Sequence, residues 1–253
     1  MFNTSDRYLF TQLGLDSAAL TRLGSIVHGP REPGEYRGTV RGAGKLPEAT
    51  FYVSVDPDCA VAQVDIDLAR LMGEPGRGAA TPPASDCGCG GGAAGAGGGV
   101  PRFIVHPKGY LVFHVGAGAG GFSVNLRRAE EDPGHKAWDS RVQLQRGDIF
   151  AAVVMRPGDY EMRNLLTGAR AELAVAYPVV GETAFKPPPA LHVQCGKAFE
   201  PSAVRLLPTQ GLNVHVEEAA HLRIELLRPD DGPQGDRPPT RGGWKKRGLP
   251  AAS

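Results

Sequence analysis

Glycine and proline divide this chain into short segments, and that division most strongly limits what it can fold into. The sequence has 35 glycines and 22 prolines in 253 residues, well above the usual share of these two residues. A long helix or a coiled coil needs stretches without them, and collagen needs glycine at every third position. The chain has no apolar run of about 18 residues, the length that indicates a membrane-spanning helix. The composition therefore favours a fold of short strands and turns.

Alternation of apolar and polar residues between these breaks predicts strands over most of residues 100–229. In one segment, Leu111, Phe113 and Val115 share a face, as in a strand with one buried side. The segments recur about every ten residues, which is typical of sandwiches and barrels. We expect a mainly β fold, an antiparallel β-sandwich in which residues 100–180 and 190–229 form either one unit or two subunits. The predicted strands lie in residues 102–107, 109–115, 121–128, 141–145, 149–155, 159–164, 170–178, 191–195, 203–208, 212–218 and 221–229.

The first 72 residues are expected to form a small α+β segment. Asp16 can cap a helix that Gly29 would end, because aspartate favours helix N-termini and glycine favours helix stops. Leu20, Leu23 and Ile26 follow at helical spacing. Strand patterns come next, over residues 36–40, 50–56 and 61–68, with residues 56–59 predicted to turn a hairpin between the last two.

Two segments lack the apolar residues needed to form a core. Residues 73–99 contain no large aliphatic or aromatic side chain, so they are predicted to be a flexible Gly/Pro/Cys linker. Such a linker could join two independent modules or be a long loop inside one fold. From residue 230 the chain is polar and rich in proline and glycine, and we expect residues 230–253 to be a disordered basic tail.

Charge and the N-terminal sequence bear on partners and compartment. The formal net charge is +1, so no overall field attracts nucleic acid or an anionic membrane. The first residues do not show a basic stretch followed by an apolar one, so no secretory signal is predicted. We therefore expect a cytoplasmic protein that does not bind nucleic acid.

The four cysteines suggest a possible metal site. Cys87 and Cys89 are one residue apart in the linker, and paired thiolates bind soft metals such as Cu(I) and Zn(II). Cys59, Cys195 or a histidine would have to complete the shell. Alternatives are a redox or attachment role and an incidental Gly/Cys linker. In an exported protein, a Cys59–Cys195 disulfide would also be an option.

Glycine and aspartate patterns are better explained by structure than by catalysis. Residues 116–121 fit the dinucleotide-binding pattern G-x-G-x-x-G, but the segment that follows alternates like a strand and not like the required helix. A glycine-rich hairpin loop is therefore predicted. The tripeptide 146–148 is predicted to be a turn, and Asp65 and Asp67 to share a solvent-facing strand side. We find no nucleophile elbow, P-loop or kinase motif.

The histidines and the basic tail are the remaining candidates for binding. His192, His215 and His221 alternate with apolar residues and are predicted to lie on polar faces, as solvated side chains or as ligands. In the tail, a basic and aromatic cluster could contact a phosphate, an acidic lipid or a protein groove. The candidate partner-binding residues of the tail are Trp244, Lys245, Lys246 and Arg247.

Part of the chain resembles known sandwich folds. Residues 199–201, 204–206 and 210–212 resemble the opening strands of cupredoxin-like sandwiches. Residues 148–164, with Pro157-Gly158 before Tyr160, look like the late strand-turn-strand of cupredoxin-like or immunoglobulin-like sandwiches. The resemblance implies a fold class for residues 100–229. A blue-copper site would need His and Met close after a cysteine, and Cys195 is followed by Gly, Lys and Ala.

These observations favour a binding role over catalysis. Our leading hypothesis is a non-enzymatic β-sandwich that acts as a structural or interaction component of a larger assembly, with a protein partner or with copies of itself. The alternative is a metal-handling protein for Cu or Zn that uses Cys87 and Cys89. An enzyme built on the sandwich is a third interpretation.

Overall fold

The structure is a computed structural model that describes residues 13–43, 48–73, 100–130, 137–176, 188–207 and 209–230. These residues form three β-sheets and one short helix, α2 (Leu68–Leu71). The expected mainly β, sandwich-like class is confirmed. Among the described residues, no helix has the length and apolar character needed to cross a bilayer.

A seven-stranded sheet is the common layer of the molecule. Along its strands, buried and half-exposed residues alternate, as in β10, because one face packs on a core. Its strands, in spatial order, are β14 (Phe199–Glu200), β13 (Leu191–Cys195), β16 (Gly211–Val216), β10 (Ile149–Val153), β2 (Gly24–His28), β7 (Tyr110–His114) and β5 (Gln63–Asp67).

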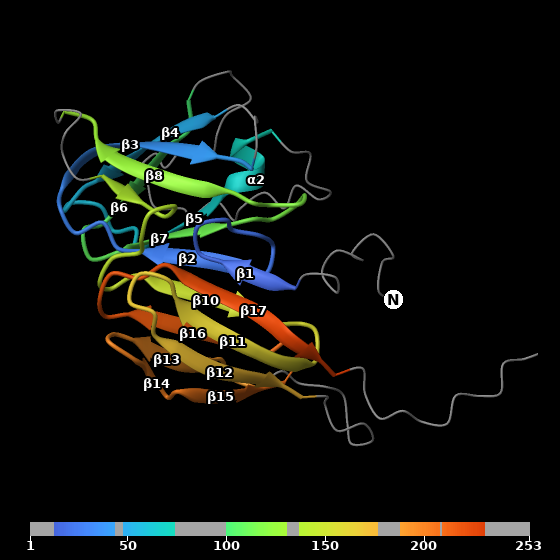
Figure 1. The fold of residues 1–253 in the computed structure, drawn as a ribbon. Helices are drawn as coiled ribbons and strands as arrows, with labels where there is room; N and C mark the ends of the chain where they lie inside the picture. The colour runs from blue at the N-terminus through green and yellow to red at the C-terminus, as the bar shows by residue number, and fades with distance from the viewer. Residues whose placement is uncertain are drawn as a thin grey trace, which may run out of the picture.

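Two five-stranded sheets cover the two halves of this layer (Figure 1). The first contains β1 (Gly14–Asp16), β17 (Leu222–Pro229), β11 (Gly158–Asn164), β12 (Arg170–Val175) and β15 (Ala203–Leu206). The second contains β6 (Arg102–Val105), β4 (Ala49–Val55), β3 (Gly34–Arg41), β8 (Ser123–Arg128) and β9 (Trp138–Asp139).

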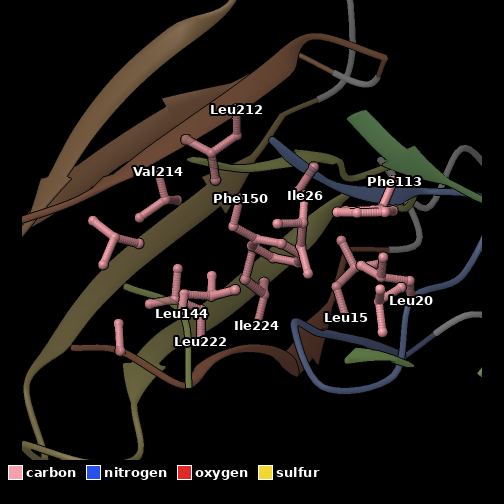
Figure 2. Close-up of a cluster of buried hydrophobic side chains, with 14 of the residues drawn as sticks. Leu15, Leu20, Ile26, Phe113, Leu144, Phe150, Leu212, Val214, Leu222 and Ile224 are labelled. Atoms are coloured by element: carbon pink, nitrogen blue, oxygen red, sulfur yellow. The ribbon is translucent and has the colours of Figure 1, made fainter. Parts of the chain in front are cut away.

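One continuous core joins the three sheets. In Figure 2, Leu222 and Ile224 of β17 lie opposite Val214 of β16, with Phe150 of β10 between them. Toward the other half of the molecule, Phe113 of β7 lies 6.3 Å, centroid to centroid, from Phe51 of β4. The facing sheets therefore interdigitate as in a sandwich.

The strands on both sides of residues 73–99 belong to the same sheets. β2 pairs with β10 and β7, and β3 pairs with β8. β1 also pairs with β17, near the end of the described chain. The described residues between 13 and 73 therefore pair into the same sheets as those after residue 100. The predicted linker after Gly73 and the predicted tail after Asp230 lie outside the described residues.

The predicted helix between Asp16 and Gly29 is wrong. Asp16 does accept a hydrogen bond from the Ala18 backbone N–H at 2.8 Å, as a cap would. The chain then makes only a turn, because Leu20 bonds to Phe122 instead (N···O 2.7 Å) and Ile26 lies in β2 between two partner strands. Pairing on both sides outweighs a weak helical pattern that is too short to be stable alone.

The predicted connections between strands are also partly wrong. Residues 56–59 do turn, with Cys59 N–H donating to Asp56 O at 3.2 Å, but β4 and β5 lie in different sheets and form no hairpin. Residues 116–121 likewise join β7 to β8 in another sheet. The sheets are mixed instead of purely antiparallel, since β12–β15, β13–β16, β4–β6 and β5–β7 pair in parallel. Alternation indicates which face of a strand is buried, but not the partner or its direction.

Candidate functional site

A cleft of about 930 Å³ opens beside the end of β2 and the turn that precedes β10. This volume is in the range of small-molecule sites. The turn positions Asp148: its N–H donates to Gln145 O at 3.0 Å, and Gly147 takes the left-handed conformation with φ 93°. Because β2 and β10 pair antiparallel from Val27 and Ile149 onward, His28 is brought next to Asp148.

Asp148 forms the buried floor of the cleft, with its side chain only 3% exposed. Its Oδ1 accepts a hydrogen bond from His28 Nδ1 at 2.7 Å. Its Oδ2 accepts from Trp138 Nε1 at 2.8 Å and from the Gln145 N–H at 2.7 Å. A buried carboxylate is stable only with such donors, and here three donors fix its position.

The His28 ring is held in one orientation. It stacks on Trp138 with ring centroids 4.3 Å apart, and Trp138 in turn lies 5.6 Å from Phe113. Since the Asp148 carboxylate accepts the bond, Nδ1 carries the proton and a neutral ring presents Nε2 as an acceptor. Among the described residues, Nε2 has no hydrogen-bond partner, and the side chain, 11% exposed, lines the cleft. Nε2 is therefore open to a ligand.

Four positively charged side chains surround this floor, and we call them the rim cations. They come from different elements, and all four are exposed. No ion pair joins any of them to a carboxylate within the described part of the chain. The rim cations are Arg31, Lys108, Arg127 and Arg146.

The other charges of the cleft are compensated. Arg128 lies 3.5 Å from Glu32, nitrogen to oxygen, and its Nη2 donates to Pro33 O at 2.9 Å. Asp148 is the only other acidic residue among the described residues that line the cleft, and its carboxylate is already hydrogen-bonded. The cleft therefore has an excess of positive charge that can attract a small anion.

A second histidine–aspartate pair connects β1 and β17. Asp16 Oδ1 lies 2.8 Å from His221 Nε2, and its Oδ2 accepts from Arg223 at 2.8 and 3.0 Å. Burial raises the pKa of Asp16, but hydrogen bonds from His221, the Ala18 N–H and Arg223 outweigh this and lower the pKa to about 2. The charges balance within the pair of strands, so this cluster is structural.

The structure describes two of the four predicted metal-ligating cysteines. Cys59 and Cys195 are both free and buried. Cys195 is in β13, whereas Cys59 precedes β5 at the opposite end of the seven-stranded sheet. Burial raises the pKa of Cys195 to about 11 despite a hydrogen bond from Asn164, which makes it a poor thiolate. Cys87 and Cys89 lie outside the described residues, so the metal hypothesis that uses them stays a prediction.

The histidines on polar faces have two different environments. His192 and His215 meet, with Nδ1 and Nε2 at 2.8 Å, while His221 binds Asp16 instead. The described residues contain no group of three or more His, Cys, Asp or Glu side chains arranged to hold a metal ion. Trp244, Lys245, Lys246 and Arg247 lie outside the described residues.

The other sequence patterns have structural roles. The 146–148 tripeptide forms the predicted turn. Asp67 caps α2 and accepts from the Gly116 N–H at 3.0 Å, so the glycine lies directly against this carboxylate. A strand follows the glycine loop, as predicted, and Asp65 accepts only from Gln63 among the described residues.

The cleft is not predicted from the sequence. His28 was placed at the end of a predicted helix and Asp148 in a turn, and nothing in the local patterns joined them. One signal was available: Asp148 directly precedes a short, wholly apolar strand, where a buried carboxylate needs donors from elsewhere. No protein-family model, curated protein or solved structure matches the chain.

Proposed function

We propose that this protein is a binding component that holds a small organic anion, with phosphate or carboxylate groups, in the cleft above Asp148. The observation that supports this most is the set of rim cations, which have no ion-pair partner in the described residues and surround an open histidine nitrogen. Like charges that line one cleft repel one another, so a bound anion would relieve a cost as well as form contacts.

Each part of the cleft has a separate task in this proposal. The guanidinium groups of Arg31, Arg127 and Arg146 can bind phosphate or carboxylate oxygens in a bidentate way. The His28 Nε2 accepts a hydrogen bond from a hydroxyl or amine of the same ligand. Because Asp148 and Trp138 hold the ring in place, this contact needs little reorganisation.

Calorimetric titration of the full chain with inorganic pyrophosphate and with citrate, at low ionic strength, tests the proposal. We expect saturable binding at one site, which weakens as salt rises because the rim cations are exposed. The double variant Arg127→Gln/Arg146→Gln should bind at least about tenfold more weakly, since each lost charge-assisted bond is worth about 1.5–3 kcal/mol.

The matched control is Arg205→Gln, an exposed arginine of β15 in another sheet. It removes one positive charge, as each of the single variants Arg127→Gln and Arg146→Gln does, but leaves the cleft intact, and it should bind like the wild type. Equal loss in the control would indicate non-specific attraction. Failure of both anions to bind the wild type, or unchanged binding by the double variant, would overturn the proposal.

The wider role as a component of a larger assembly is a separate proposal. The sandwich offers large exposed surfaces, and a binding component can act through a partner or through copies of itself. Size-exclusion chromatography with light scattering, with and without pyrophosphate, tests self-association. A strict monomer under both conditions would exclude self-association and leave a different protein as the partner.

A further inference from the structure

Two histidines meet on the outer face of the seven-stranded sheet, away from the cleft. His192 is in β13 and His215 is in β16, which run parallel side by side. In the register, His192 pairs with Asn213 and Gln194 with His215. The two histidines are therefore diagonal neighbours on one face, close enough for long side chains to touch.

Their ring nitrogens face each other directly. His192 Nδ1 lies 2.8 Å from His215 Nε2, the ring planes are 26° apart, and the centroids are 5.1 Å apart. Since the short contact is between nitrogens of nearly coplanar rings, the rings meet edge to edge. Such a contact has one proton between two nitrogens, so at least one ring is neutral.

The surroundings of the two rings differ. His192 is exposed and His215 is half-buried. Burial and the neighbouring charge of His192 lower the pKa of His215, although Glu217 opposes this. Metal ions bind the neutral imidazole, and the short nitrogen–nitrogen contact already requires at least one of the two rings to be neutral.

We propose that His192 and His215 form a two-histidine site for a divalent transition metal, with Cu(II) preferred. Two nitrogens bound at about 2.0 Å and about 90° to each other are separated by about 2.8 Å, the spacing of a tetragonal Cu(II) or Ni(II) centre. The nitrogens already have this separation. The rings need only pivot so that both lone pairs turn outward to one ion.

The fit is better for Cu(II) than for other metals. A tetrahedral Zn(II) centre would need the nitrogens to separate to about 3.3 Å. Imidazole suits copper and nickel, and copper binds most tightly in the general order of these divalent ions. Water completes the coordination, because the site is at the surface. The proposal depends neither on Cys87 and Cys89 nor on the anion cleft.

The test is a Cu(II) titration of the full chain in which Cys87→Ser and Cys89→Ser remove the two adjacent thiols. We expect one Cu(II) per chain by calorimetry and nitrogen hyperfine structure from two imidazoles by electron paramagnetic resonance. Adding His192→Gln or His215→Gln should weaken binding at least tenfold and remove the two-imidazole signal. Zn(II) should bind more weakly than Cu(II).

The matched control is His114→Gln, which changes another half-exposed histidine, on β7 of the same sheet. It should keep both the stoichiometry and the spectrum. Thermal unfolding of each variant without metal checks that the fold is intact; His192 is exposed, so at least His192→Gln is expected to fold. If His192→Gln/His215→Gln binds Cu(II) as tightly as its parent, or if the parent shows no two-imidazole spectrum, the proposal is overturned.

Discussion

The described residues contain two histidine–aspartate pairs with nearly the same bond length, formed through different ring nitrogens, and with different surroundings. His28 and Asp148 lie 2.7 Å apart at the floor of the cleft, and His221 and Asp16 lie 2.8 Å apart between β1 and β17. Both bonds join residues far apart in the sequence and both hold two strands together. The difference is in the other charges around them.

Around Asp16 the charge is balanced locally, whereas around Asp148 it is not. Arg223 bonds directly to Asp16, so no cation is left for a ligand. Asp148 is satisfied instead by His28, Trp138 and a backbone N–H, which leaves the rim cations without carboxylate partners among the described residues. A histidine–aspartate pair is therefore no evidence for a site by itself; the uncompensated charge beside it is.

The largest effect is expected from Asp148→Ala. It removes the acceptor of three donors, of which the Trp138 and Gln145 groups have no other partner among the described residues. Leaving buried donors unpaired should lower the free energy of unfolding by about 3 kcal/mol. Urea denaturation at pH 7 measures it. A change below about 1 kcal/mol would mean that water enters the floor and replaces the carboxylate.

Asp16→Asn should have the next largest effect and a distinct pH dependence. The folded pKa of about 2 is below the ordinary value of 3.8, so the ionised carboxylate contributes stability above pH 3.8 that is lost as the pH falls through about 2. This shift corresponds to about 2 kcal/mol at pH 7. Urea denaturation of wild type and variant from pH 7 to pH 2 should show the two converging at the acid end.

The control for Asp16→Asn is pyrophosphate binding, which should not change because the cleft keeps all its cations. A difference in stability that stays constant down to pH 2 would contradict ionisation as its source. The lost stability would then come from the altered hydrogen-bond geometry around residue 16.

This contrast was not predictable from the sequence, although most strands were. Alternation over residues 212–218 predicts β16, because a strand with one buried face has that pattern, and a short, wholly apolar run over residues 149–155 predicts β10. Such local patterns do not predict which strands pair. Since β2 was predicted as helix, its pairing with β10, and with it the contact between His28 and Asp148, could not be inferred.

The second pair was hidden for a similar reason. His221 was correctly placed on a polar face, but β1 was not predicted, so Asp16 was interpreted as a helix cap. The sequence indicates individual strands through the alternation of their side chains. Each histidine–aspartate pair depends instead on pairing between strands more than one hundred residues apart.

Trp138→Phe separates the hydrogen bond of the cleft floor from its packing. The phenyl ring can keep the stack between His28 and Phe113, while the bond from Nε1 to Asp148 is lost. One lost bond to a carboxylate that keeps two other donors should cost about 1 kcal/mol. Chemical denaturation measures this change. A loss as large as that of Asp148→Ala would show that ring packing, and not the carboxylate, organises the floor.

The smallest effect on stability is expected from Arg146→Gln. Comparing it with Arg223→Gln, which changes the arginine of the other pair, is the sharpest test of the difference between the two pairs. Arg146 is exposed and without a carboxylate partner among the described residues, so Arg146→Gln should change the free energy of unfolding by less than about 0.5 kcal/mol. It should nevertheless weaken pyrophosphate binding about tenfold.

Arg223→Gln should do the opposite, because Arg223 bonds to Asp16 and is not among the residues that line the cleft. It should cost up to about 1 kcal/mol of stability and leave binding unchanged. If both variants lose stability and binding to the same degree, the two pairs do not differ in the way their surrounding charges indicate.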